Sequence, residues 1–124
     1  MREIKFRAWD ERGEDSYGQA VTPKYIYDIQ NTYDDENGYS FEEVLATPKL
    51  ILEQFTGLHD KNGKEIYEGD IPDGYGAVFF SNEYLGYFAK SNEFECEYKP
   101  IYDIPIIEII GNIHENPELL ESPC

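Results

Sequence analysis

The feature that most constrains this chain is its division into short apolar runs that are separated by turn residues. The clearest case is Asn62-Gly63, which stands between the short arms 58–60 and 65–67. An Asn-Gly pair tolerates the positive φ angles of a tight turn, so this stretch predicts a β-hairpin. Residues 77–89 predict a second hairpin, because a short polar turn separates two aromatic runs there.

The same pattern continues along the rest of the chain. Further strands are predicted at 4–9, 24–29, 50–55, 93–98 and 106–110. Short helices are predicted at 40–45, from the spacing of a capping box, and at 116–120, from an Asn-Pro start. Many short strands with frequent turns are typical of a small sheet or barrel with minor helices.

The length of the chain predicts one domain with one core. Its 124 residues lie within the usual size of a domain, so we expect a single domain over 1–124. Aromatic residues make up 15% of the chain and bury a large area each, which favours a core despite the polar composition. The residues expected in this core are Ile4, Phe6, Phe55, Ile66, Ile109 and Leu119.

Acidic residues dominate the composition and restrict the choice of partner. The formal net charge is -16 at pH 7, from 26 acidic and 10 basic residues. The first 24 residues are neutral overall, so the rest of the chain carries the whole excess. Direct binding of nucleic acid requires a positive face, and it is therefore not expected. A protein partner with a basic surface is expected instead.

The cysteines and the apolar runs indicate the compartment. Cys96 and Cys124 cannot form a framework of disulfides, which favours a reduced, intracellular protein. The charged start of the chain does not resemble a signal peptide. No apolar run approaches the roughly 18 residues that span a bilayer, so we expect no membrane partner.

The sequence offers no convincing arrangement for catalysis. His59 and His114 are the two histidines, and no spacing argument brings Cys96 beside either of them. Residues 60–63 resemble a calcium loop faintly, but its first and last ligand positions hold no carboxylate. We therefore expect no enzyme activity, no catalytic residues, no cofactor and no metal site.

Two acidic segments are the candidate partner-binding surface. Alternation along 93–98 places three glutamates on one strand face, about 6.8 Å apart, and leaves Phe94 and Tyr98 on the opposite face to hold the fold. A nearby acidic loop and a tyrosine-rich segment add charge and anchoring rings. The alternative is a solvated edge that discourages aggregation. The candidate residues are Glu93, Glu95, Glu97, Asp34, Asp35, Glu36, Tyr33 and Tyr39.

Three blocks of sequence carry a family resemblance. They are Ile4-Lys5-Phe6-Arg7-Ala8-Trp9-Asp10, the long block 55–71 around Asp60-Lys61-Asn62-Gly63-Lys64, and the block 107–120 that ends in Asn116-Pro117-Glu118-Leu119-Leu120. Together they resemble the YopX family of phage and prophage proteins.

The resemblance implies a compact β fold with a barrel-like sheet, a phage or prophage origin, and a cytoplasmic location in a bacterial host cell. It implies no activity and supplies no site residues. Pro72 departs from the family pattern, in which a valine-rich strand follows, and a central strand is not expected to run through a proline.

The pattern and the resemblance together predict a mainly β fold, α+β by count of elements. We expect a small SH3-like or barrel-like sheet with an N-terminal strand extension and one or two short helices.

The leading hypothesis for function is a phage or prophage accessory protein that binds another macromolecule. Its sharpest form is an acidic mimic of nucleic acid that inhibits a host defence protein such as a CRISPR nuclease. Such binding weakens as salt screens the charges. The alternative is a self-associating structural or regulatory phage module, a homo-oligomer held by apolar patches without nucleic-acid mimicry.

Overall fold

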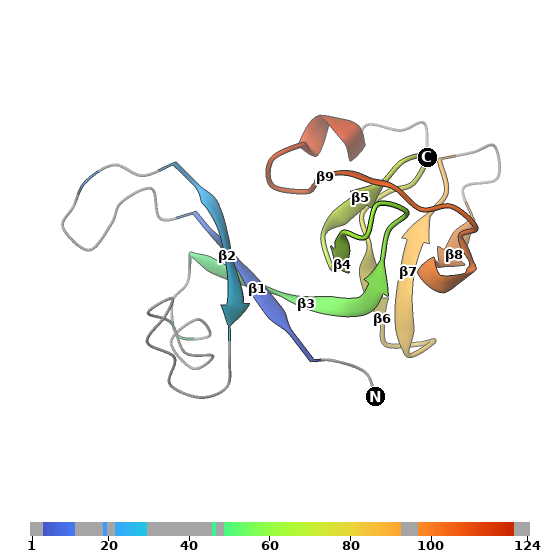
Figure 1. Ribbon diagram of the computed structural model, residues 1–124, viewed down its shortest axis with the longest axis horizontal. Coiled ribbons are helices and arrows are strands. Elements are labelled where there is room, and N and C mark those ends of the chain that lie inside the picture. Colours follow the sequence, from blue (N-terminus) through green and yellow to red (C-terminus); the bar gives the residue numbers. More distant parts are fainter. Residues whose placement is uncertain are drawn as a thin grey trace. The chain divides into compact units, whose positions relative to one another are not determined.

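The structure, a computed structural model, describes residues 4–11, 19, 22–29, 46, 49–92 and 97–120. Strands dominate these residues and the helices are short, which confirms the predicted mainly β fold. The chain divides into two compact units, Met1–Gln54 and Phe55–Cys124 (Figure 1). Each unit is described by itself below.

The N-terminal unit is built on antiparallel pairing around its first strand. Strand β1 (Phe6–Asp10) pairs with β2 (Lys24–Ile29) on one side and with the first half of β3 (Leu50–His59) on the other. A small apolar cluster forms where the strands meet, made of Ala8 and Leu50 with Phe6, Ile26 and Leu52 against them.

A buried ion pair lies beside this cluster. Arg7 and Glu53 face each other across β1 and β3, with only 2% and 4% of their surfaces exposed. Arg7 Nε donates to Glu53 Oε1 at 2.8 Å, and Arg7 Nη2 donates to the Tyr25 hydroxyl at 3.1 Å. The guanidinium carbon lies 3.9 Å from the centre of the Tyr25 ring, which in turn packs against Trp9. Here a carboxylate and an aromatic ring compensate a buried charge.

The C-terminal unit begins with the hairpin that the sequence predicts. The second half of β3 pairs with β4 (Glu65–Tyr67), and the Asp60 amide donates to the Lys64 carbonyl at 2.8 Å. Gly63 has a φ of 83°, so the Asn-Gly prediction is confirmed. Strand β5 (Asp70–Pro72) then pairs with β9 (Ile109–Asn112). β5 ends at Pro72, as expected of a residue without an amide donor.

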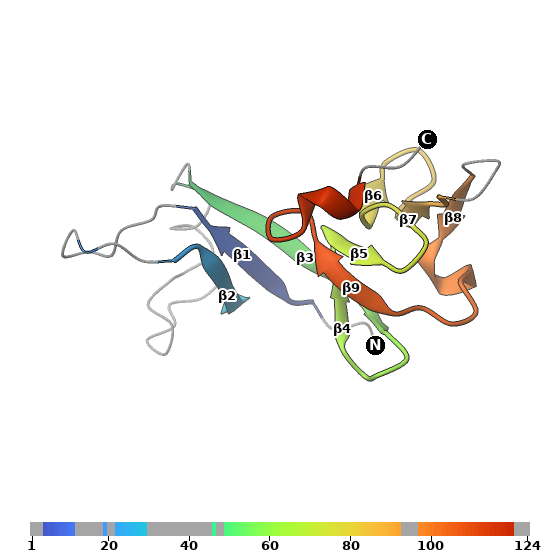
Figure 2. The same ribbon diagram turned by 90° about the horizontal axis from the view of Figure 1, so that it is seen from above.

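A three-stranded antiparallel sheet follows, in the order β6-β7-β8 (Figure 2). Its strands are β6 (Phe79–Ser81), β7 (Gly86–Lys90) and β8 (Tyr98–Pro100), and the β6–β7 pair confirms the second predicted hairpin. Two 3₁₀ helices, η1 (Ile101–Asp103) and η2 (Pro117–Leu120), complete the unit. The main apolar cluster consists of Ile66, Val78, Tyr87, Ala89, Ile101, Ile104 and Ile109.

The prediction of a single core is wrong, since within the described ranges each unit has an apolar cluster of its own. Ile4 is 72% exposed, because it precedes β1 and no neighbouring strand pairs with it. Leu119 is half-buried and lies outside the main cluster.

The last predicted strand also begins later than expected. Ile106 is 76% exposed, and the carbonyls of Ile107 and Glu108 accept hydrogen bonds from the amides of Lys61 and Asp73 instead of forming a strand ladder. The ladder with β5 begins only at Ile109. The helix predicted at 40–45 and residues 93–96 of the predicted strand 93–98 lie outside the described residues.

Candidate functional site

The sheet β6-β7-β8 has two different faces. Successive side chains of a strand point to opposite sides of a sheet. Tyr87 and Ala89 of β7 face the main apolar cluster and are buried. Phe88, between them, faces the other way and stands directly opposite Phe79 of β6. Tyr98 of β8 pairs with Lys90, two residues beyond Phe88, so it shares this outer face.

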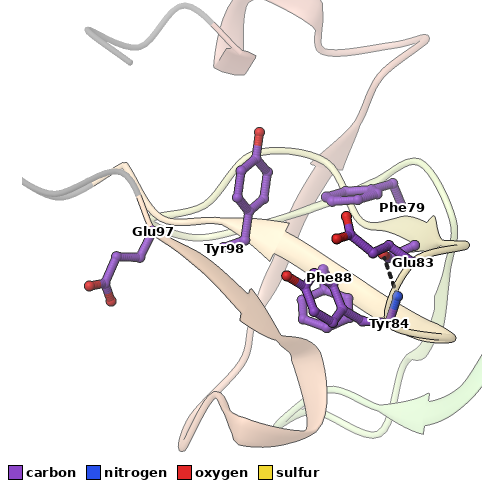
Figure 3. A pocket seen from close by; sticks show the side chains of 7 residues that line it. Phe79, Glu83, Tyr84, Phe88, Glu97 and Tyr98 are labelled. Carbon is purple, nitrogen blue, oxygen red and sulfur yellow. Dashed lines mark hydrogen bonds between the residues drawn. The ribbon is translucent and has the colours of Figure 1, made fainter.

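An open groove of about 580 Å³ occupies the outer face (Figure 3). We call it the aromatic groove. It is lined by Phe79, Ser81, Glu83, Tyr84, Phe88, Glu97 and Tyr98. Its walls come from the β6–β7 hairpin and from the start of β8.

The rings of the aromatic groove pack against one another but remain open to solvent. The Phe79 ring centre lies 6.4 Å from that of Phe88 and 5.7 Å from that of Tyr98, and Tyr84 lies 5.8 Å from Phe88. Nevertheless Tyr84 is 70% exposed and Tyr98 is 60% exposed. Such exposed amphipathic rings are the side chains that most often anchor protein interfaces.

The turn between β6 and β7 holds two large apolar side chains in solvent. The Ser81 hydroxyl accepts a hydrogen bond from the Tyr84 amide at 3.1 Å, which fixes the turn. Leu85 follows with a φ of 53° and is 79% exposed. A leucine is disfavoured in this left-handed conformation, and local strain of this kind often accompanies function.

Charges of both signs border the aromatic groove. Glu83 makes no ion pair with any part of the chain that the structure describes. In the view of Figure 3 its side chain lies between Phe79 and the pair Tyr84 and Phe88, whereas the Glu97 carboxylate points away from the rings. At the β8 end, Lys90 Nζ lies 5.7 Å from the centre of the Tyr98 ring. The β6–β7 end of the groove therefore carries the negative charge of Glu83, and Lys90 adds a positive charge beside Tyr98 at the other end.

Of the predicted partner-binding residues the structure describes Glu97. Glu97 is exposed directly before β8 and lines the groove. Tyr98, expected on the face that holds the fold, is exposed instead, because the outer face of β6-β7-β8 is open to solvent. The residues that lie outside the described part are Glu93, Glu95, Asp34, Asp35, Glu36, Tyr33 and Tyr39.

Sequence reasoning missed the three other rings of the groove, Phe79, Tyr84 and Phe88. A signal was present in the two aromatic pairs, Phe79-Phe80 and Tyr87-Phe88. Because adjacent strand residues point to opposite faces, each pair must place one ring away from the core. Period-two analysis of the hairpin would have found an aromatic outer face.

Asp60 organises the β3–β4 turn and ties it to β9. Its Oδ1 accepts hydrogen bonds from the amides of Asn62 and Lys64, both at 2.9 Å, and its Oδ2 accepts one from the Ile109 amide at 3.1 Å. Burial acts to raise the pKa of Asp60, but these donors outweigh it and the pKa is lowered. The segment is thus a turn. Among the described residues no cluster of three or more histidine, cysteine, aspartate or glutamate side chains is arranged for a metal ion.

A second, smaller groove of about 310 Å³ lies beside this turn. Its apolar wall includes Ile106 and Tyr102, which is 78% exposed. The charged groups at its rim are already engaged, since Lys61 pairs with Glu108 at 3.6 Å and Asp60 accepts three amides. It therefore offers less to a charged ligand than the aromatic groove does.

None of the helices within the described ranges has the length and apolar character needed to cross a membrane.

Comparisons with known proteins give a consistent result. The sequence pattern of the YopX protein family matches residues 5–121. A solved structure, the crystal structure of protein EF1440 from Enterococcus faecalis, is similar with a TM-score of 0.50 and 26% sequence identity. That similarity covers 98% of this chain and 100% of the other chain. No curated protein matches the chain.

Proposed function

Because the chain belongs to the YopX protein family, we propose that it is a phage-type accessory protein whose aromatic groove binds a protein partner. The observation that carries this proposal is the outer face of β6-β7-β8, which exposes Tyr84 and Tyr98 beside the exposed carboxylates of Glu83 and Glu97. The protein acts by binding rather than by catalysis, in the cytoplasm of a bacterial host.

The composition of the aromatic groove supports a protein ligand. Aromatic rings supply large contact areas at a small cost in side-chain entropy, and tyrosine is enriched among the residues that dominate binding energy. The rings form one patch, because the strand register sets Phe79 opposite Phe88 and the Phe79 ring against Tyr98. Contiguous apolar patches of this kind mark interaction sites on soluble proteins.

The net charge supports a basic partner. With a charge of -16, the chain attracts a positive surface over distances of roughly one Debye length, about 8 Å at physiological salt. A basic surface that normally binds nucleic acid is one such target, and mimicry of nucleic acid against a host defence protein is the sharpest form of the proposal. The groove itself favours recognition of side chains, since among the described residues that line it four are aromatic and two, Glu83 and Glu97, carry negative charge.

Self-association is the second candidate, favoured by the exposure of Leu85 and Tyr84 at the β6–β7 turn. Two copies that each carry a charge of -16 repel one another, so self-association strengthens as salt is added. Binding to a basic partner weakens under the same change. The sign of the salt dependence therefore distinguishes the two.

The test is capture of partners from a bacterial lysate at about 50 and 500 mM salt. The immobilised proteins are the wild type, the double variant Tyr84→Ala/Tyr98→Ala, and the control Tyr102→Ala, which removes an equally exposed tyrosine outside the groove. We expect a basic protein that the wild type and the control retain at low salt, and that the double variant loses by at least about tenfold. Equal retention by all three proteins contradicts the proposal.

A further inference from the structure

The N-terminal unit shows how this chain accommodates an arginine. The Arg7 guanidinium stacks on the Tyr25 ring at 3.9 Å while its Nε donates to the Glu53 carboxylate at 2.8 Å. The planar guanidinium suits this combination, because its face contacts the ring while its edge presents N–H donors to a carboxylate. One tyrosine and one glutamate thus contact the face and the edge of a buried arginine side chain.

The aromatic groove contains the same kinds of side chain without an arginine. Glu83 and Tyr84 are exposed at the β6–β7 turn, with the Phe88 ring 5.8 Å from that of Tyr84. From this correspondence we infer that the Glu83 end of the groove binds an arginine side chain of the partner. The guanidinium stacks on the Tyr84 and Phe88 rings and donates to the Glu83 carboxylate. The inference rests on the proposed function and specifies its ligand.

Charge within the groove places the arginine at the Glu83 end. Lys90 already sets a cation 5.7 Å from the Tyr98 ring, and a second cation beside it is repelled. Glu97, although it lines the groove, turns its carboxylate away from the rings in Figure 3. Glu83 is therefore the carboxylate placed to act together with aromatic rings.

Arginine is favoured over the other side chains that a basic partner offers. A lysine ammonium is compact and strongly hydrated, so it gains less from stacking on a ring and cannot present a flat fork of donors. An apolar side chain packs on the rings but leaves the carboxylate without a partner. The guanidinium therefore satisfies both parts of the groove better than either of these side chains does.

The inference is tested by selecting a displayed library of random twelve-residue peptides on four proteins. These are the wild type, Glu83→Gln, Tyr84→Ala and the matched control Glu118→Gln, which removes an exposed carboxylate of η2 outside the groove. On the wild type and the control we expect arginine at one peptide position to be enriched at least threefold over lysine. On Glu83→Gln and Tyr84→Ala that enrichment returns to the level of the unselected library.

The outcomes separate this inference from the proposed function. Peptides that need Tyr84 but show no preference for arginine, or keep it on Glu83→Gln, overturn the inference and leave the groove as a binding surface. Peptides that bind all four proteins equally, or a selection that enriches none, overturn both. Far-ultraviolet circular dichroism of each variant confirms that the fold is retained.

Discussion

The two units of this chain differ in the use of their aromatic side chains, which support a buried charge in one unit and also form an exposed outer face in the other. In the N-terminal unit Trp9 and Tyr25 pack together at 4.9 Å, with the buried pair Arg7 and Glu53 beside them. In the C-terminal unit Tyr87 packs in the core with aliphatic residues such as Ile66, while Tyr84 and Tyr98 stand in solvent. If the aromatic groove binds a partner as proposed, stability and binding depend on different residues. Changes to the first set should affect folding, and changes to the second should affect partners.

The largest loss of stability is expected from a substitution in the interior of the N-terminal unit. Replacing Glu53 with alanine removes the acceptor 2.8 Å from Arg7 Nε and leaves a buried charge undercompensated. Breaking a buried pair in this way costs about 3–5 kcal/mol of unfolding free energy. Trp9 is the single tryptophan and is 5% exposed, so its fluorescence follows this unit alone during urea unfolding. A loss below about 1 kcal/mol would mean that the pair does not support the fold.

The next effect concerns Asp60, which fixes the turn in the C-terminal unit. In Asp60→Asn the side-chain oxygen still accepts the turn amides, but the new NH₂ group faces the Ile109 amide, donor against donor. An unsatisfied pair of this kind costs about 1–3 kcal/mol, measured by urea unfolding followed by circular dichroism at pH 7.

The lowered pKa of Asp60 predicts that the stability of the protein depends on pH. Because folding lowers the pKa of Asp60, the native state binds this proton less readily than the unfolded state does. The ionised Asp60 carboxylate adds to the unfolding free energy in full above the unfolded pKa of about 3.9. This stabilisation is lost as the pH falls through the lower folded pKa. The wild type should therefore lose more stability than Asp60→Asn between about pH 4 and pH 2. Parallel curves for the two proteins would contradict this assignment.

The smallest expected effect is a gain in stability at the β6–β7 turn of the C-terminal unit. Leu85 lies at a φ of 53°, where a side chain costs about 1–2 kcal/mol, whereas the greater freedom of glycine in the unfolded chain costs about 0.5–1. Leu85→Gly should therefore raise the unfolding free energy by about 0.5–1 kcal/mol in the same measurement. We expect it also to weaken partner capture, because an exposed apolar side chain leaves the turn. A variant that is less stable than the wild type would show that Leu85 is not strained.

Sequence patterns revealed the local structure better than the binding surface. The Asn62-Gly63 turn and the end of β5 at Pro72 follow from single-residue geometry, and both were predicted. The late start of β9 was not, because it depends on Lys61 and Asp73, residues distant in sequence that bind the carbonyls of 107 and 108. Tertiary hydrogen bonds of this kind leave no local pattern.

The proposed binding surface was harder to predict for a related reason. Glu97 was a candidate because of charge alternation, but the rings beside it come from another hairpin and gather only when β7 pairs with β8. The alternation of residues in one strand cannot show which of its two faces will join the exposed face of a neighbouring strand. Tyr98 was consequently assigned to the wrong face.

The most direct test of the account maps contacts on the isotopically labelled wild-type protein by nuclear magnetic resonance. The added ligand is an arginine-containing twelve-residue peptide selected on that protein. We expect the largest shift changes at Tyr84, Phe88 and Tyr98, and no change at Trp9 and Tyr25 of the N-terminal unit. Largest changes at Trp9 and Tyr25, or at Tyr102 in the second groove, would contradict the assignment of binding to the outer face of β6-β7-β8.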